Sequence, residues 1–305
     1  MKYFSPLFLF LPILITLALS ETFVSFFSIN AIVQIFLFLF VVHIPAYKTG
    51  RMSYVDIAWP LGVLAIGVLA IVVGEGAPIK KYSIGVVYIC IGGRMGIASL
   101  VWLYRGAFTK ELPRYKFQRI RWGKEKKTNV QLAMQIDIFI QSLANTTYLS
   151  LPALFLAFDP KESVHPLEIF GLVVWFLAIS LEYIADAQKS NFAKQAIADG
   201  RRKDVCTVGL WRYTRHPNYF FEWMVWNALI CMALPACTAW FFKADLLLGI
   251  FLSIGLLYIS RLMYNTLVLF TGALPSEYYS VKKRPGYKKY RQSTNMFFPG
   301  KPRFK

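Results

Sequence analysis

Histidine and cysteine are scarce in this sequence. Among 305 residues there are only three histidines, His43, His165 and His216, whereas the di-iron membrane desaturases and hydroxylases need many histidine ligands. The four cysteines show no CxxC spacing, which argues against a zinc site and against a disulfide framework. We therefore exclude these classes of metalloenzyme, interpret the cysteines as packing residues and expect no bound metal.

Charged residues are also few. They make up 16% of the chain, whereas hydrophobic residues make up 56%, and the mean hydropathy is +0.47. This composition lies outside the range of water-soluble globular domains and is typical of a membrane protein. Acidic residues number only 16 against 34 Lys and Arg, which gives a net charge of +18. No soluble stretch is long enough for a basic nucleic-acid-binding module, so we expect no nucleic-acid partner. We expect the chain to associate with a membrane, and we infer no protein partner.

The sequence also lacks internal repeats, low-complexity tracts and a separate soluble domain. Its longest polar connections, about 105–130 and 187–218, are too short to carry an independent core. No GxGxxG motif follows a strand pattern, so a Rossmann nucleotide-binding domain is not expected. We predict a single membrane domain, residues 1–305.

Long apolar runs dominate what is present. Each is near the length needed to cross about 30 Å of hydrocarbon. They fall at 3–20, 22–43, 55–74, 82–104, 131–158, 166–186, 219–242 and 246–270. The first run has features of a signal peptide, but a second run follows after Glu21, so we favour an uncleaved span. The sequence therefore predicts an all-α, multi-pass transmembrane bundle of seven to eight spans.

Basic residues concentrate on one side of this topology. Of the 34 Lys and Arg residues, 28 fall in the N-terminus, the C-terminal tail and the connections that share their side. The positive-inside rule places that side, with both termini, in the cytosol. The terminal KPRFK resembles a dilysine retrieval signal, which favours the endoplasmic reticulum in a eukaryotic host, although a bacterial host stays open.

Ionisable groups inside the spans gather toward the predicted cytosolic end. They are Asp56, Asp137, Glu182, Asp186 and Glu222, whereas Arg94 and Arg261 lie near mid-membrane. Residues four apart share a helix face, and one polar stripe of this kind comprises Asp137, Gln141, Asn145 and Tyr148. Such groups line a polar cavity or pair with one another between helices. Both interpretations stay open at this stage.

The segment GLWRYTRHPNYFFEW, residues 209–223, places charge at the start of an apolar run. Pro217 suits the first turn of a helix, whose unpaired backbone N–H groups attract anions. Arg212 and Arg215 flank this helix start, and we expect both to be exposed to water. The pattern therefore indicates an anion site. Glu222, one turn further on, needs a ligand or a fixed partner if it is buried.

These residues carry a family resemblance. The motif at 215–222, Arg-His-Pro-Asn-Tyr and then an acid four residues after the Asn, resembles the signature of the steroid 5α-reductase and sterol reductase superfamily. The segments EYIADAQKSNF (182–192) and KRPGYKKYRQSTNMFFPG (283–300) resemble its neighbouring patterns. SYVDIAWPLG (53–62) and KELPRY (110–115) resemble N-terminal marks of an uncharacterised 5α-reductase-like branch.

The resemblance implies that the C-terminal half, residues 166–305, binds NADPH from the cytosolic side, and that the N-terminal spans, residues 1–165, face the substrate. It implies reduction of a carbon–carbon double bond, usually conjugated to a carbonyl, in a steroid, sterol or other lipid. By this resemblance, the cofactor contacts are Asp186, Lys189, Arg215, His216, Asn218, Tyr219, Glu222, Tyr287, Tyr290 and Arg291.

The catalytic group and the reaction class leave alternatives. Reduction of an enone needs a group where negative charge develops on oxygen, and the candidates are Asp56, Arg94 and Tyr148. Membrane methyltransferases of the isoprenylcysteine or phospholipid type also use an Arg-His-Pro segment, to bind S-adenosylmethionine. Phe221 stands where relatives often have Gly, which is consistent with a third class, a non-enzymatic lipid-binding protein.

Overall fold

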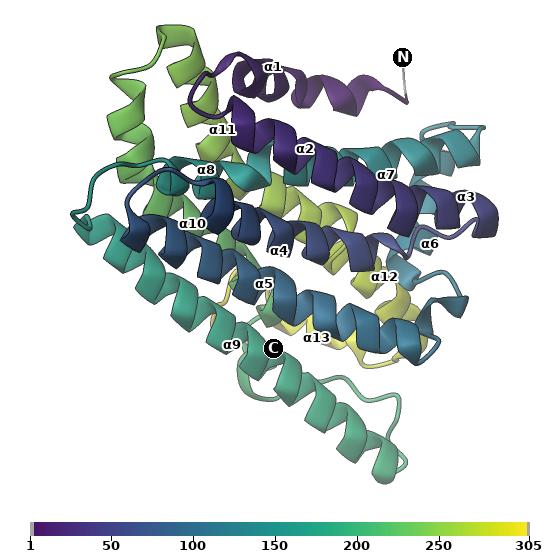
Figure 1. Cartoon of the computed structure of the whole chain (residues 1–305). Coiled ribbons are helices and arrows are strands. Elements are labelled where there is room, and N and C mark those ends of the chain that lie inside the picture. Colours follow the sequence, from purple (N-terminus) through teal and green to yellow (C-terminus); the bar gives the residue numbers. More distant parts are fainter. Residues whose placement is uncertain (1–2, 304–305) are drawn as a thin grey trace. The chain divides into compact units, whose positions relative to one another are not determined.

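The chain folds into helices. A computed structural model describes residues 3–303, and these residues contain helices and no strand, as the sequence predicts. The α-helices are α1 Leu11–Leu19, α2 Val24–Phe38, α3 Ile44–Thr49, α4 Val55–Val73, α5 Pro78–Tyr104, α6 Pro113–Lys124, α7 Val130–Thr146, α8 Leu151–Ala157, α9 Pro166–Ala198, α10 Pro217–Phe241, α11 Leu246–Asn265, α12 Ala273–Lys283 and α13 Tyr287–Ser293 (Figure 1). Short 3-10 or π-helical segments are η1 Ser5–Leu9, η2 Leu39–His43, η3 Ala107–Thr109, η4 Tyr148–Ser150, η5 Gly209–Arg212 and η6 Thr266–Phe270.

The contacts divide the chain into two compact units. Unit 1 comprises Met1–Ile169 and Ile230–Ile259, and unit 2 comprises Phe170–Leu229 and Ser260–Lys305. The helices α9, α10 and α11 each contribute residues to both units. The predicted assignment of substrate and cofactor to the two halves of the chain stays a prediction.

Six helical segments of the described chain are long and apolar enough to cross a membrane. They are Val24–Thr49, Val55–Val73, Pro78–Tyr104, Pro166–Ala198, Pro217–Phe241 and Leu246–Lys283. By helix length and hydropathy, the chain is therefore a multi-pass membrane protein. The predicted runs 3–20 and 131–158 are not among these six, so the expected seven to eight continuous helices reduce to six.

Prolines interrupt the two missing runs. A proline removes one backbone N–H, and its ring conflicts with the carbonyl four residues earlier, so a helix rarely continues through it. Pro12 stands at the start of α1, which has only nine residues, and Pro152 stands at the start of α8. The break between α7 and α8 lies at Thr147, which is fully buried. Irregular backbone at membrane depth is tolerated where protein covers it.

The segment 130–157 returns along unit 1 despite its break. Trp122 Nε1 of α6 donates to Asp137 Oδ2 of α7 (2.9 Å), so α7 begins beside the helix that follows the end of α5. Lys80 Nζ, near the start of α5, forms an ion pair with Asp159 just after α8 (2.5 Å). α7 and α8 together therefore connect the two ends of α5. Figure 1 shows α2, α4, α5 and α7 side by side in this unit.

The segment 3–23 extends between the same two regions of unit 1, the beginning of α7 and the region of α8. Near its start, Tyr3 Oη accepts a hydrogen bond from Asn129 N, just before α7 (3.0 Å). At its end, the ring of Phe23 packs edge-on against Phe155 of α8, with 5.6 Å between the ring centroids. η1 and α1 thus lead from the beginning of α7 to the region of α8.

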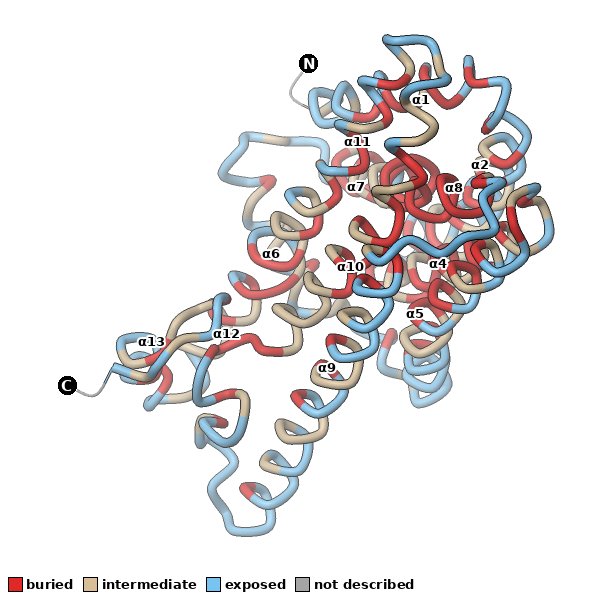
Figure 2. The backbone as a smooth tube through the Cα atoms, turned by 90° about the vertical axis from the view of Figure 1, so that its left-hand side faces the viewer, coloured by how far each residue is buried: buried red, intermediate tan, exposed pale blue. Residues whose placement is uncertain are grey.

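The predicted polar stripe packs between helices of unit 1. Asn145 Nδ2 donates to Gln34 Oε1 (3.3 Å) and to the carbonyl of Trp59 (3.0 Å). Asp137 accepts from Gln118 Nε2 (2.6 Å) as well as from Trp122. For Asp137 and Asn145, the structure therefore agrees with pairing between helices, the second of the two interpretations. All residues of α8 are buried nearby (Figure 2).

The two N-terminal motifs meet at the start of α4. Glu111 accepts hydrogen bonds from Met52 N and Ser53 N, both at 3.0 Å. Ser53 Oγ in turn accepts from Leu112 N (2.8 Å). These two N–H groups precede Tyr54, the N-cap residue of α4, so Glu111 holds the chain that leads into the helix. Residues 53–62 and 110–115 therefore form one structural junction.

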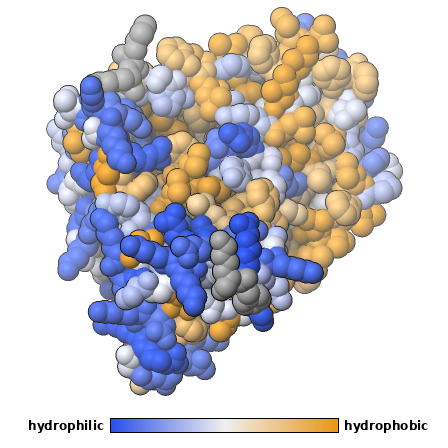
Figure 3. All heavy atoms as spheres, turned by 180° about the vertical axis from the view of Figure 1, so that it is seen from behind, coloured by the Kyte–Doolittle hydropathy of each residue, from blue (hydrophilic) through white to orange (hydrophobic). Residues whose placement is uncertain are grey.

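Large apolar side chains remain exposed on several helices. Val72, Ile97, Phe176 and Leu246 are each more than half exposed. Hydrophobic residues cover much of the face seen in Figure 3, while hydrophilic residues gather in a separate area. Exposed apolar surface of this extent is expected where lipid is the solvent.

Candidate functional site

The motif segment and the C-terminal tail pair through their backbones in unit 2. Thr214 and Asn295 form an isolated parallel bridge, in which Arg215 N donates to Asn295 O (2.9 Å). Thr214 Oγ1 donates to the carbonyl of Phe297 (2.9 Å). Pro217 then begins α10, at the first-turn position that the sequence predicts. The closing segment therefore fixes the entry to α10.

Glu277 of α12 holds the charged side chains of the motif. Its Oε1 accepts from Arg215 Nε (2.6 Å) and lies 3.3 Å from His216 Nε2. Its Oε2 lies 3.2 Å from Arg291 Nε, although the geometry of that contact is not that of a hydrogen bond. Arg215, His216 and Glu277 are all buried. We name Arg215, His216, Glu277 and Arg291 the Glu277 cluster.

The expectation that Arg215 is exposed was therefore wrong. Its side chain is only 6% exposed, and Nη1 donates to the carbonyls of Arg291 (3.0 Å) and Thr294. A buried guanidinium is tolerated when a carboxylate and several acceptors surround it. Arg212, by contrast, is exposed as predicted. The helix start is thus flanked by one exposed and one buried arginine.

His216 is neutral in this environment. Burial lowers the pKa of His216 below its usual value, and the hydrogen bond to Glu277 opposes this only in part. Its ring stacks on Tyr219, with 5.4 Å between the ring centroids and 10° between the planes. The stack fixes the imidazole against the first turn of α10.

The segment EYIADAQKSNF (182–192) of α9 supports the motif. Gln188 Oε1 accepts from Leu210 N (2.9 Å), and Trp211 Nε1 donates to the carbonyl of Ala185 (2.8 Å). Lys189 Nζ lies 4.2 Å from the centroid of the Trp211 ring, in cation–π contact. Gly209 has a φ of +54°, and a Cβ there would meet Gln188 at 2.4 Å, so only glycine suits this turn.

Three predicted cofactor contacts on the first turns of α10 are half-buried: Asn218, Tyr219 and Glu222. Asp186 on α9, another predicted contact, is exposed. The Oδ1 atom of Asn218 is buried and makes no hydrogen bond within residues 3–303. Eight other buried side-chain atoms of the described chain, Asn145 Oδ1 among them, also make no hydrogen bond, and such atoms can bind water or a ligand. Asn218 therefore offers an acceptor to a ligand.

The two predicted tyrosines of α13 are buried. Tyr290 Oη donates to the carbonyl of Trp211, and the rings of Tyr287 and Tyr290 pack edge-on at 5.7 Å. Burial raises the pKa of both hydroxyls. Both side chains therefore remain protonated, and Tyr290 connects α13 to the motif segment.

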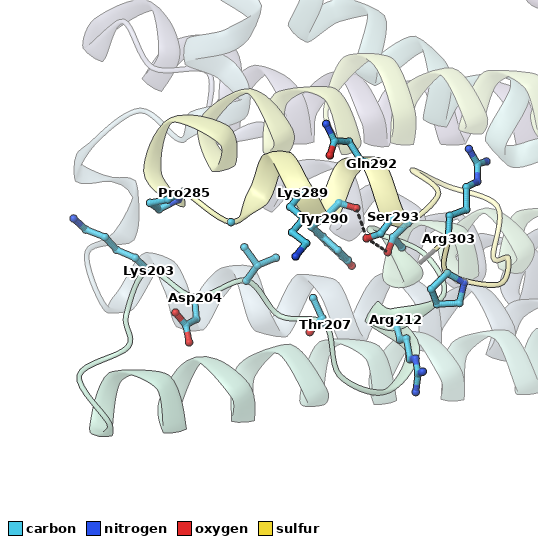
Figure 4. A pocket seen from close by; sticks show the side chains of 14 residues that line it. Lys203, Asp204, Thr207, Arg212, Pro285, Lys289, Tyr290, Gln292, Ser293 and Arg303 are labelled. Atoms are coloured by element: carbon cyan, nitrogen blue, oxygen red, sulfur yellow. Dashed lines mark hydrogen bonds between the residues drawn. The ribbon is translucent and has the colours of Figure 1, made fainter. Parts of the chain in front are cut away.

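A basic pocket opens beside Tyr290. It has a volume of about 1130 Å³ and lies between residues 203–212 and residues 285–303 of unit 2. Figure 4 shows Lys289 and Tyr290 directed from α13 toward the loop that carries Thr207. The cationic side chains of the pocket are suited to an anionic group such as a phosphate.

The three catalytic candidates belong to unit 1. Asp56 accepts from Tyr115 Oη and lies 3.3 Å from Arg114 Nη2. Tyr148 Oη donates to the carbonyl of Leu9 (2.8 Å). Arg94 is half-buried on α5. Asp56 and Tyr148 thus have packing partners, and the catalytic role of all three residues stays a prediction.

Sequence reasoning missed Glu277. It is the only acidic residue after Asp245, and a single acid in so basic a segment was a usable signal. The sequence could not supply its partner, because Arg215 lies 62 positions earlier. It also missed the buried ion pairs of Lys80, which lies 2.9 Å from Glu168 as well as close to Asp159.

These features define a multi-pass helical membrane protein in which a motif before α10 and a C-terminal segment assemble one polar site. The chain belongs to the family described as "Protein of unknown function (DUF1295)", whose pattern matches residues 42–294. Comparison with curated proteins found no match, and comparison with solved structures found none either. The family match extends from η2 to the end of α13.

Proposed function

We propose that this protein is an NADPH-dependent membrane oxidoreductase. It reduces a carbon–carbon double bond, conjugated to a carbonyl, in a steroid, sterol or other lipid. The observation that carries the proposal is the assembly, within unit 2, of the three segments that resemble the reductase signature. Trp211 contacts the segment 182–192, and Arg215 contacts both Glu277 and the closing segment.

The residues of this chain would hold the cofactor in distinct ways. Asn218 Oδ1 accepts a hydrogen bond from it, and Tyr219, Glu222, Asp186 and Lys189 contribute further contacts. Glu277 keeps Arg215 and His216 in place. These two buried side chains support the segment that leads into α10. NADPH supplies a hydride when it is bound.

We infer that the two interrupted segments, 3–20 and 131–158, also cross the membrane, which gives eight spans. The end-to-end course of both segments in unit 1 supports this inference. With eight spans, the connections rich in Lys and Arg share one side, and the positive-inside rule puts both termini in the cytosol. In a eukaryotic host the membrane is that of the endoplasmic reticulum.

Ligand-induced thermal stabilisation of the detergent-purified protein tests the reaction class. NADPH, NADH and S-adenosylmethionine are compared in parallel, since a ligand that binds only the folded state raises its stability. We expect a shift with NADPH. A shift with S-adenosylmethionine alone would instead assign the chain to the methyltransferases, and no shift with any of the three would favour a lipid-binding protein that lacks chemistry.

A substitution tests the site itself. Asn218→Ala removes the unpaired acceptor and should weaken NADPH binding by about 1 to 3 kcal/mol, the usual cost of losing a buried hydrogen-bond partner. Asn227→Ala on the same helix is the matched control, because Asn227 Nδ2 is already bonded to the carbonyl of Trp223 (2.7 Å). Equal NADPH affinity in both variants would contradict the assignment of Asn218.

A further inference from the structure

The basic pocket of unit 2 contains more positive charge than its own walls neutralise. Its cationic side chains are Lys203, Arg212, Lys289 and Arg303, and its one acidic side chain is Asp204. Asp204 Oδ2 is already bound by Nη1 of Arg201 (2.9 Å), which is not part of the wall. The wall therefore has four cations against one carboxylate, and that carboxylate is already paired with Arg201.

Two of the cations form no ion pair with any residue that the structure describes. They are Lys203 and Lys289. Arg303 is positioned by neutral groups: its Nη2 donates to Asn295 Oδ1 (3.1 Å), and its backbone N donates to Ser293 O (2.7 Å). Within residues 3–303, the pocket thus has three basic side chains, Lys203, Lys289 and Arg303, that form no ion pair with a carboxylate.

The basic residues come from both walls. Lys203 belongs to the connection between α9 and α10, and its side chain is directed outward at the edge of the pocket, whereas Lys289 belongs to α13 and reaches into the space between the two walls (Figure 4). Thr207 and Ser293 add hydroxyl groups to the lining. Several cations with neighbouring hydroxyl donors are suited to a phosphate monoester, which carries nearly two negative charges at neutral pH.

The pocket adjoins the Glu277 cluster. Thr294 lines the pocket, and its backbone carbonyl accepts a hydrogen bond from Arg215. Tyr290 also lines the pocket and contacts the motif segment through the carbonyl of Trp211. A volume of about 1130 Å³ is large enough for part of a nucleotide. The pocket therefore lies directly beside the motif segment.

We propose that this pocket binds the 2′-phosphate of NADPH and makes the protein select NADPH over NADH. This inference rests on the proposed function, because it names the part of the cofactor that the pocket takes. NADPH and NADH differ only in that phosphate. Cations that contact it contribute to the affinity for NADPH and leave the affinity for NADH unchanged.

Charge reversal within the pocket tests the inference. The variants Lys289→Glu on α13 and Lys203→Glu on the opposite wall are compared with Lys288→Glu. Lys288 is exposed on the same helix as Lys289 but is not part of the pocket wall. Dissociation constants are measured by direct titration of the purified protein with NADPH, NADH and 2′,5′-ADP, so that binding is read without turnover.

The expected result is selective. Lys289→Glu and Lys203→Glu should each weaken binding of NADPH and 2′,5′-ADP by about 10- to 100-fold, with NADH unchanged, and Lys288→Glu should match the wild type. Wild-type binding of NADPH with no loss in either pocket variant would overturn this inference and leave the proposed function standing. A wild-type protein that binds neither NADPH nor 2′,5′-ADP would overturn both. Equal losses for NADPH and NADH would also overturn it, because the pocket would then recognise another part of the cofactor.

Discussion

Glu277 is a single residue on which three positively charged or polar partners converge. Its carboxylate is 4% exposed and faces Arg215, which is 6% exposed. Removing one member of a buried ion pair strands the other, which costs about 3 to 5 kcal/mol. We therefore expect Glu277→Gln to lower the stability of the protein by about that amount. The measurement is the thermal unfolding midpoint in detergent.

A second variant separates burial from charge. Arg291 also lies near Glu277, but its side chain is 48% exposed, and exposed pairs contribute about 1 kcal/mol or less. Arg291→Gln should therefore leave the midpoint almost unchanged. If Glu277→Gln and Arg291→Gln have the same midpoint, Glu277 does not stabilise unit 2 in the way proposed here.

His216 should make stability depend on pH. Burial lowers its pKa in the folded state, whereas in the unfolded chain the pKa is about 6.5. The unfolded state therefore binds more protons in the range just below pH 6.5. The stability contributed by neutral His216 is fully present above that pH and is lost as the pH falls through it.

Unfolding midpoints from pH 8 to pH 5 measure this effect. The wild type should lose stability below about pH 6.5, and His216→Gln should show a smaller loss. His165→Gln is the control, because His165 is exposed and should leave the wild-type profile intact. Parallel profiles for the wild type and His216→Gln would show that another group causes the acid sensitivity.

At the scale of elements, the start of α4 depends on an acid from a distant segment. Glu111 is 10% exposed and accepts the backbone N–H groups of Met52 and Ser53. Glu111→Ala should lower stability by about 2 kcal/mol, because two backbone donors just before the helix lose a charged acceptor. Glu125→Ala, at an exposed acid, should cost less than about 1 kcal/mol. Denaturation in detergent checks both, and equal effects would contradict a stabilising role of Glu111 at the entry to α4.

Most helices were predictable because apolar runs of membrane length fix their positions. The run at 55–74 became α4, Val55–Val73, although Pro60 lies within it. The prediction of continuous helices at 3–20 and 131–158 was wrong, because new helices begin with Pro12 and Pro152 in their first turns. A proline can bend or end a helix, and packing decides between these outcomes.

The candidate site was predictable only where local rules decide the structure. The position of Pro217 at the start of α10 follows from local rules. The burial of Arg215 does not, because it depends on Glu277 and on the carbonyls of the tail. Long-range partners of this kind are fixed by tertiary packing, which one sequence does not reveal.

At the scale of the whole molecule, charge distribution and helix count constrain each other. With only the six continuous helices as spans, the basic connection at 105–129 would lie on the opposite side of the membrane from the basic C-terminal tail. The positive-inside rule disfavours that arrangement. Two further crossings, by 3–20 and 131–158, place both regions on one side. The charge pattern therefore favours eight crossings.

Thiol labelling decides between six and eight crossings. In a variant with all four cysteines replaced by alanine, single cysteines are introduced as Lys2→Cys, Thr22→Cys, Lys126→Cys and Glu162→Cys, of which the last three are at exposed positions. A membrane-impermeant thiol reagent is applied to sealed vesicles of known orientation. Eight crossings place Lys2 and Lys126 on the cytosolic side and both Thr22 and Glu162 on the other. Labelling of Glu162 together with Lys126 would mean that 131–158 does not cross, and labelling of Lys2 together with Thr22 would mean the same for 3–20.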